Sequence, residues 1–238
     1  MIDQIGAILL TAAGAALVGV PVALAPAGPR AKGLALAAAA GWGGLVLAAA
    51  ATGGFAPGVF GPVPGPGVAF LGLLALLLAG WRVLPSFREA LMAVPLAALI
   101  ALNAARVFGA FFLLLAAQGR LSDPFAASAG WGDVATGLAA VPLAVLAWRR
   151  AGRPGGLIAA WNAFGALDLF AAIALGVLSA PGTPFQVFAG GPGTGPMGEL
   201  PWAVVPAMLV PLYLLVHLTI AAKLRAAPRP AGRVATAG

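Results

Sequence analysis

Four ionisable residues stand inside long apolar stretches of this chain: Arg106, Asp133, Asp168 and His217. A charged side chain at membrane depth is costly, so such residues usually face the interior of a helix bundle and pair with a partner. Arginine can hold an anionic group, aspartate can balance its charge, and histidine can gain or lose a proton near neutral pH. These residue types therefore indicate a ligand-binding or ion-coupled site.

Counting along the predicted helices indicates which of these residues meet. At about 1.5 Å per helical residue, Arg106 lies roughly 27 Å from Arg88, and Asp168 lies roughly 22 Å from Arg153. Arg88 and Arg153 mark the same membrane face, so the two inner residues lie at similar depth. We predict that Arg106 and Asp168 interact directly or through one polar group, because pairing relieves two desolvation penalties together.

A second polar group is predicted nearer the cytoplasmic face, where His217 and Asn162 fall about 9 Å from Lys223 and about 13 Å from Arg153. Helical spacing also aligns Tyr213 with His217, Asn103 with Arg106, and Trp161 with Asp168. Polar stripes on three helices predict a common interior cavity. The candidate ligand-binding or ion-coupling residues are Arg106, Asp168, His217, Asn162, Asn103, Tyr213 and Trp161.

Two other functions fit the same residues. Buried polar pairs can lock helix packing and register without any ligand, as in a non-catalytic accessory or scaffold subunit. A membrane enzyme acting on a lipid or quinone is the third hypothesis, with His217 as base and with Trp161, Phe185 and Phe188 forming an apolar slot. Asp133 lies at the predicted outer end of a helix, where we interpret it as a favourable charge at the helix dipole.

Several chemistries have no support in the sequence. A single His and no Cys predict neither a metal site nor a cofactor. No Ser–His–Asp set and no nucleophile elbow can be assembled, so no catalytic residue is assigned. The leading hypothesis is a membrane protein that binds or transports a small anionic ligand, with Arg106 holding it, Asp168 balancing the charge and His217 sensing protons.

The elements that must position these residues are helices in a bilayer. The chain has 238 residues, of which 62% are hydrophobic and 8% charged, and this composition excludes a soluble globular protein. A membrane-crossing helix needs about 20 apolar residues. Seven stretches qualify, at about 4–25, 33–53, 67–84, 89–118, 131–148, 155–179 and 201–223.

The predicted fold is an all-α, polytopic membrane protein with one transmembrane domain over residues 1–225 and a disordered basic tail over 226–238. The fourth span is long enough to kink at Pro95, and Ser86 with Glu89 forms a capping-box pattern at its start. The first span has no Lys or Arg before it, unlike a secretory signal peptide, and is predicted to be retained.

Charge position predicts the orientation. Seven spans place eleven Lys and Arg residues on one side and Arg120 alone on the other. We therefore expect the N-terminus outside and the C-terminus in the cytoplasm, in a bacterial inner membrane. The basic runs suit anionic headgroups rather than nucleic acid. The expected partners are the lipid bilayer, a small anionic ligand, and either a second copy of the chain or another membrane protein.

Two outer loops, at 55–67 and 179–199, are rich in Gly, Pro and Phe. They are either interfacial connections with aromatic anchors or, for the longer loop, a lid over a cavity that opens outward. The sequence leaves both interpretations open.

Residues 103–220 resemble a group of small bacterial multi-pass membrane proteins of uncharacterised function. The resemblance rests on recurring elements that include Arg106, Gly132-Asp133, Trp161-Asn162, Phe185-Gln186 and His217. It implies that the polar elements form one unit, and that the first three helices vary more, but it supplies no activity or cofactor. Where such proteins carry Asn before the Asp of the fifth span, this chain has Gly132, which predicts a reduced polar network there.

Overall fold

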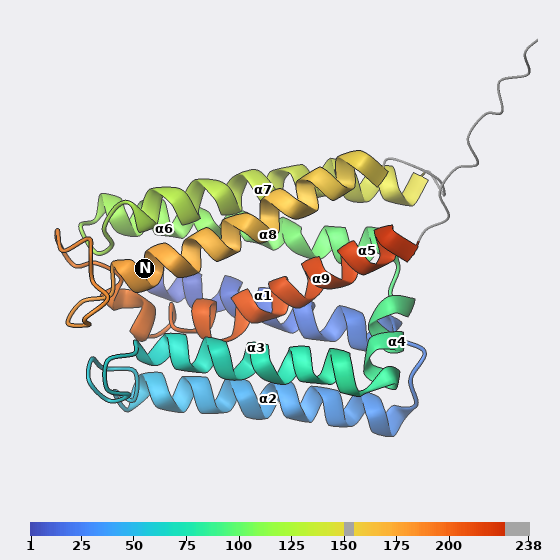
Figure 1. Cartoon of the computed structure of the whole chain (residues 1–238), viewed down its shortest axis with the longest axis horizontal. Coiled ribbons are helices and arrows are strands. Elements are labelled where there is room, and N and C mark those ends of the chain that lie inside the picture. The colour runs from blue at the N-terminus through green and yellow to red at the C-terminus, as the bar shows by residue number, and fades with distance from the viewer. Residues whose placement is uncertain (150–154, 227–238) are drawn as a thin grey trace, which may run out of the picture.

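The computed structural model describes residues 1–149 and 155–226, which form an elongated helical bundle without β-strands (Figure 1). Within these ranges, seven helical segments are long and apolar enough to cross a membrane, so the predicted all-α class is confirmed and the number of candidate spans equals the number predicted. The long helices outside the fourth span are α1 (Ile2–Leu24), α2 (Pro29–Ala51), α3 (Gly65–Val83), α7 (Phe125–Arg149), α8 (Gly155–Leu178) and α9 (Val210–Ala226). A multi-pass membrane protein follows from these segments.

The fourth span differs from the single kinked helix predicted over 89–118. A separate short helix, α4 (Pro85–Ala93), ends before Pro95, and the span itself begins with α5 (Leu96–Leu102). Val94 is extended because the Pro95 ring disfavours a helical residue before it, so the chain breaks where a kink was expected. The capping-box prediction for Ser86 and Glu89 was wrong, since α4 begins at Pro85 without a side-chain cap.

The middle of the fourth span is wound as a 3-10 helix, η1 (Asn103–Gly109), which continues into α6 (Ala110–Ala117). A 3-10 segment has about three residues per turn and a longer rise than an α-helix. It carries Arg106, and α7 packs along it. The local winding therefore sets the direction in which Arg106 leaves the helix.

Helix α7 begins six residues earlier than the predicted span at 131–148. The Asp123 carboxylate accepts a hydrogen bond from the Ala127 backbone N–H at 2.9 Å, which caps the first turn. Pro124 stands just before the helix, where its missing N–H costs nothing. As a result, Asp133 lies about two turns inside α7 rather than at its end.

Helix α9 forms the centre of the bundle. Its span includes the one-turn π-helix η3 (Val205–Leu209), and 61% of an 18-residue stretch of this span is buried, against 6% of an equal stretch of α2. Figure 1 shows α9 between α3 and α8, with α2 at the edge of the molecule. The side chains of α9 are therefore placed to meet those of several other helices.

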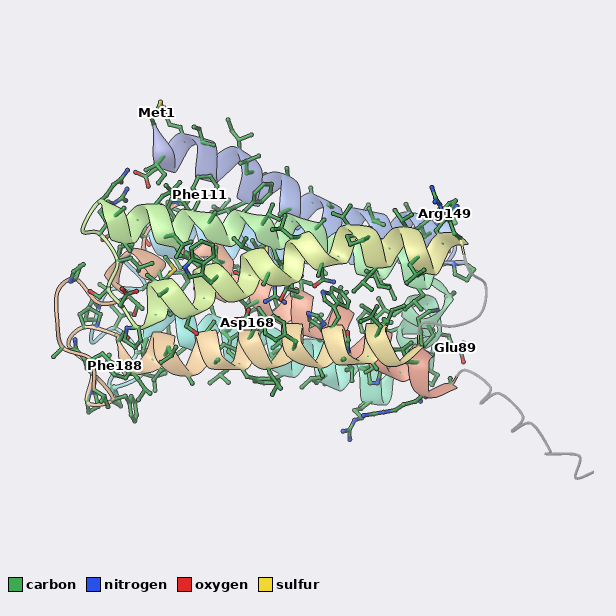
Figure 2. The ribbon with its side chains drawn as sticks, turned by 90° about the horizontal axis from the view of Figure 1, so that it is seen from above. Met1, Glu89, Phe111, Arg149, Asp168 and Phe188 are labelled. Atoms are coloured by element: carbon green, nitrogen blue, oxygen red, sulfur yellow. The ribbon has the colours of Figure 1, made fainter. Side chains whose placement is uncertain are left out.

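The two ends of the bundle differ in charge. The end that holds α4, called here the basic end, carries Arg30, Lys32, Arg82, Arg88, Arg149, Lys223 and Arg225. The opposite loop end holds Met1, Arg120 and the loops 52–64, 118–124 and 179–204. Figure 2 shows Met1 and Phe188 at one end, Glu89 and Arg149 at the other, and Asp168 between them. Arg150, Arg153, Arg229, Arg233 and the predicted tail beyond Ala226 lie outside the described residues.

At the loop end, the only acidic residue of helix α1, Asp3, binds two residues outside this helix, Arg120 and Trp202. The Asp3 carboxylate accepts hydrogen bonds from Arg120 Nη1 at 3.1 Å and from Trp202 Nε1 at 2.8 Å, and it forms an ion pair with Arg120 Nη2 at 3.0 Å. Gly6 packs against the Trp202 ring, where a Cβ would approach to 2.7 Å. These contacts join α1 to the segment that leads into α9.

Candidate binding site

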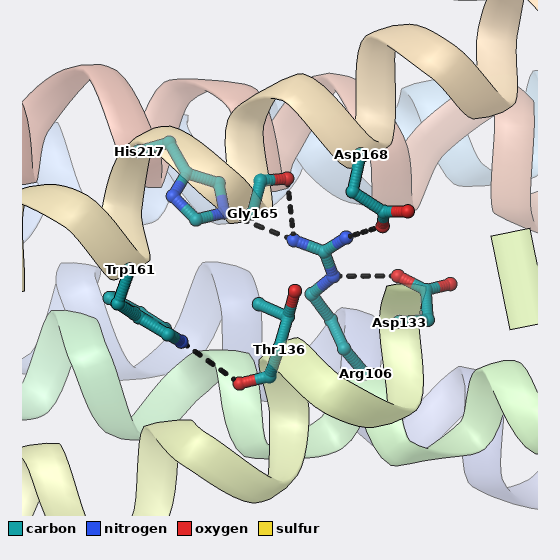
Figure 3. Close-up of polar contacts among 7 residues, drawn as sticks. All are labelled: Arg106, Asp133, Thr136, Trp161, Gly165, Asp168 and His217. Carbon is teal, nitrogen blue, oxygen red and sulfur yellow. Dashed lines mark hydrogen bonds and ion pairs between the residues drawn. The ribbon is translucent and has the colours of Figure 1, made fainter. Parts of the chain in front are cut away.

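Arg106 is the centre of the polar interior, with its side chain 1% exposed. Its Nε donates to Asp133 Oδ1 on α7 at 2.6 Å, and its Nη2 donates to Asp168 Oδ2 on α8 at 2.5 Å (Figure 3). Both nitrogens lie on the same edge of the guanidinium, so two carboxylates share the edge that one carboxylate often occupies alone. The Arg106–Asp168 contact confirms the predicted interaction and shows that it is the direct one of the two forms expected.

The other edge of the guanidinium faces α8 and α9. Arg106 Nη1 donates to the Gly165 carbonyl at 2.9 Å and lies 3.1 Å from His217 Nε2. Guanidinium nitrogens only donate, so Nε2 must accept, and the imidazole is neutral with its proton on Nδ1. The Tyr213 ring lies under the guanidinium at 5.8 Å, a cation–π distance.

Asn162 on α8 holds His217 from the opposite side. His217 Nδ1 lies 2.8 Å from Asn162 Oδ1, and Asn162 Nδ2 donates to the His217 carbonyl at 3.1 Å. The Trp161 ring lies 5.7 Å from the imidazole, and its Nε1 donates to the Thr136 carbonyl at 3.1 Å. The group predicted nearer the basic end is thus joined to the Arg106 group through His217.

Small residues make room for this network. A Cβ at Gly132 would overlap the Asp168 carboxylate, and one at Gly109 would overlap Asp133. At Gly165, a Cβ would come within 2.7 Å of His217. Gly132 adds no polar side chain to the network, as the sequence predicted, but its missing Cβ admits the Asp168 side chain beside α7.

Two residues lie elsewhere than the sequence indicated. Asn103 is buried but does not join the network: its Nδ2 donates to the Leu99 carbonyl at 3.1 Å, and its Oδ1 has no partner among the described residues. The interpretation of Asp133 as a favourable charge at a helix end was wrong, since Asp133 pairs with Arg106 inside the bundle. A capping signal at Ser122-Asp123-Pro124 could have placed the helix start earlier and Asp133 deeper.

A cavity of about 510 Å³ lies between α3 and α8 towards the loop end. Its wall is largely apolar and includes four aromatic residues, Phe55, Phe70, Phe112 and Phe125. Its ionisable lining residues are Asp133, which lies inside the bundle, and Glu199 in the loop. The loop predicted as a lid contributes several lining residues, including Ala180, Thr194 and Met197.

A second, smaller cavity touches the polar network directly. It is lined by Arg106 and Tyr213, and it shares Asp133 and Phe112 with the larger cavity. Asp133 therefore stands between the apolar cavity and the guanidinium. Trp161, Phe185 and Phe188, which were expected to form an apolar slot, line neither of these two cavities, and Phe185 is exposed.

The comparisons with known proteins extend the resemblance seen in the sequence. No curated protein and no solved structure matches the chain. A domain of unknown function, DUF8737, matches residues 63–225, which include η1, α7, α8, α9 and all members of the Arg106 network. The match begins forty residues before the predicted boundary at 103, so the third span belongs to it. The chain is therefore a member of the DUF8737 family of unknown function.

Proposed function

We propose that this protein is a multi-pass membrane protein that binds a small ligand in the cavity between α3 and α8, either as a receptor or as a step in transport. The observation that carries the proposal is the combination of size and lining: about 510 Å³ of mainly apolar space reaches the Asp133 carboxylate. Cavities of several hundred Å³ with few convergent polar groups are the usual form of small-molecule sites. Asp133 would orient the ligand, and Arg106 would hold Asp133.

The contacts of Arg106 favour a role in holding Asp133 over the role expected from the sequence, in which Arg106 binds an anionic ligand directly. An anion on the guanidinium would have to displace Asp133 or Asp168, because both carboxylates already occupy its Nε–Nη2 edge. The remaining edge is taken by Gly165 and His217. Arg106 therefore serves as an internal counter-ion, and the ligand meets a carboxylate first.

The distribution of basic residues supports an orientation with the basic end in the cytoplasm and the loop end outside. In this orientation the larger cavity lies on the outer side. The resemblance to small bacterial multi-pass membrane proteins supports a location in a bacterial inner membrane. Reaction of cysteines introduced at Val187 and at Glu89 with a membrane-impermeant reagent tests the orientation, since only the former should be labelled from outside.

Filling the cavity tests the proposed function. Ala172 on α8 lines the cavity, whereas Ala174 on the same helix is exposed and does not. Native mass spectrometry of gently solubilised protein should show a stoichiometric bound mass in the wild type and in Ala174→Phe. The same mass should be lost in Ala172→Phe. An empty protein in all three, or a bound mass that Ala172→Phe leaves unchanged, contradicts the proposal.

A scaffold or accessory subunit remains the second candidate, and one observation favours it. Arg106 finds four protein partners on three helices, so the network can fix helix packing without a ligand. This function predicts a homo-oligomer or a complex with another membrane protein whose cavity is empty in the same native mass spectrum. A lipid- or quinone-acting enzyme has less support, because His217, its expected base, lines neither cavity.

A further inference from the structure

We propose that the ligand is a cation with an apolar body, and that it takes the place of a proton held by the Asp133–Asp168 pair. The inference rests on the proposed function and specifies its ligand class. Three observations carry it: the balance of charge around Arg106, the free oxygen of Asp133, and the aromatic and acidic lining of the cavity.

The balance of charge is the first observation. One guanidinium contacts two carboxylates, from Asp133 and Asp168, whose side chains are 16% and 8% exposed. With both carboxylates ionised, the cluster would hold one uncompensated negative charge at membrane depth, which is costly. Neutrality in the empty site therefore requires one proton on the carboxylate pair.

The groups that face Asp133 leave no other source of compensation. The positive charge of Arg106 on η1 is already included in the balance, and Asp168 on α8 adds negative charge. Tyr213 and His217 on α9 are neutral in their contacts with Arg106. Helix α3 contributes only apolar residues to the cavity, and Glu199 in the loop adds a second carboxylate to the lining. Apart from Arg106, the described groups that contact this cluster or line the larger cavity are therefore neutral or acidic.

The orientation of Asp133 shows where a cation would sit. Its Oδ1 accepts from Arg106, whereas no donor among the described residues reaches its Oδ2, and the residue lines the larger cavity. Asp168 does not line that cavity and keeps its contact with Arg106. The Oδ2 position is therefore available to a proton in the empty site and to a cation in the occupied one.

The aromatic lining suits the same occupant. Phe112 and Phe125 form a tilted pair with ring centroids 5.7 Å apart, and both line the cavity together with Asp133. Aromatic faces attract cations, most strongly where water is excluded. An apolar body would fill the remaining space, and Glu199 in the cavity lining would add attraction for a positive charge.

The exchange balances in atoms and charge. The ligand cation enters the cavity, the proton leaves Asp133 Oδ2 for water at the loop end, and the cluster stays neutral before and after. Because a proton is released, the affinity for the cation should rise with pH, by up to about tenfold per pH unit while the empty site is fully protonated.

Isothermal titration of the whole protein in nanodiscs, with empty nanodiscs subtracted, tests this exchange. Three probes share one body: the permanent cation 4-phenylbutyltrimethylammonium, the neutral 4-phenylbutanol and the anion 4-phenylbutylsulfonate. We expect the cation to bind about tenfold tighter than the alcohol or better, as one desolvated ionic contact would give. Titration in two buffers with different heats of protonation should show release of about one proton, and the sulfonate should not compete.

Asp133→Asn should abolish both the preference for the cation and the proton release, while the alcohol still binds. Glu89→Gln, which removes an exposed carboxylate at the basic end, is the matched control and should change neither. Equal binding of the three probes, or cation binding without proton release, in the wild type would overturn the inference and leave the proposed function standing. Failure of all three probes to bind would count against the proposed function itself.

Discussion

Neutralising the two carboxylates one at a time and then together tests the charge balance around Arg106. Asp133→Asn or Asp168→Asn alone leaves one guanidinium and one carboxylate, and the Asn side-chain oxygen still accepts from Arg106. If the native pair holds one proton, each single variant replaces a neutral carboxyl group by a neutral amide. The net charge of the cluster is then unchanged, and little stability is lost. We expect each to lower the free energy of unfolding by about 1 kcal/mol or less.

The double variant Asp133→Asn with Asp168→Asn is expected to behave differently. It leaves the Arg106 guanidinium, 1% exposed, without any counter-ion. An uncompensated charge of this kind costs about 3–5 kcal/mol. The cost of the double variant should therefore exceed the sum of the single costs by roughly 1–5 kcal/mol, which is the sign of coupling between neighbouring groups in one network.

Equilibrium unfolding in mixed micelles, followed by circular dichroism at neutral pH, measures these differences. Glu89→Gln provides the control for loss of a carboxylate outside the bundle interior. The contrary result would be single costs of about 2 kcal/mol or more that simply add in the double variant, as charged hydrogen bonds acting independently would give. That result would mean that both carboxylates are ionised and that each stabilises Arg106 separately.

Three further outcomes are expected. Gly132→Ala should destabilise the protein by about 1–3 kcal/mol, because the new methyl group overlaps the Asp168 carboxylate, whereas Gly44→Ala in α2, with open space around it, should be close to neutral in the same assay. Arg120→Ala should cost less than about 1 kcal/mol, since its pair with Asp3 is partly exposed; a larger loss would show that α1 depends on this contact. His217→Gln should preserve the pH dependence of cation binding in the titration, because the carboxylates carry the exchanged proton. Loss of that dependence in the variant would show that His217 carries the proton instead.

The sequence predicted what depends on composition and helical rise. Apolar length located five of the seven spans to within four residues, and counting from the basic ends brought Arg106 and Asp168 to the same depth. Both inferences hold because a helix in a bilayer has a fixed rise and its ends are marked by charge. Similar depth predicted that the two residues interact, but it left open whether they do so directly or through one polar group.

The remaining features depend on local winding and on tertiary packing. Asp133 was misplaced because the start of α7 is set by the Asp123 cap and not by hydropathy. Asn103 does not join the predicted network because its short side-chain amide donates a hydrogen bond to its own helical segment, at the Leu99 carbonyl. The cavity combines α3, α8 and a loop that are distant in the chain, and no periodicity in one segment could have indicated it.

Cysteine labelling can measure directly whether the cavity admits a cation next to Asp133, since the chain contains no native Cys. Ala172→Cys lines the cavity, and Val187→Cys in the exposed loop gives the reference rate for each reagent. We expect Ala172→Cys to react, with a higher ratio of the rate for a trimethylammonium methanethiosulfonate to the rate for a sulfonate methanethiosulfonate than Val187→Cys shows. Adding Asp133→Asn should remove this excess. An unreactive Ala172→Cys, or the same ratio at both positions in the otherwise native chain, would contradict a ligand cavity with a carboxylate at its inner end.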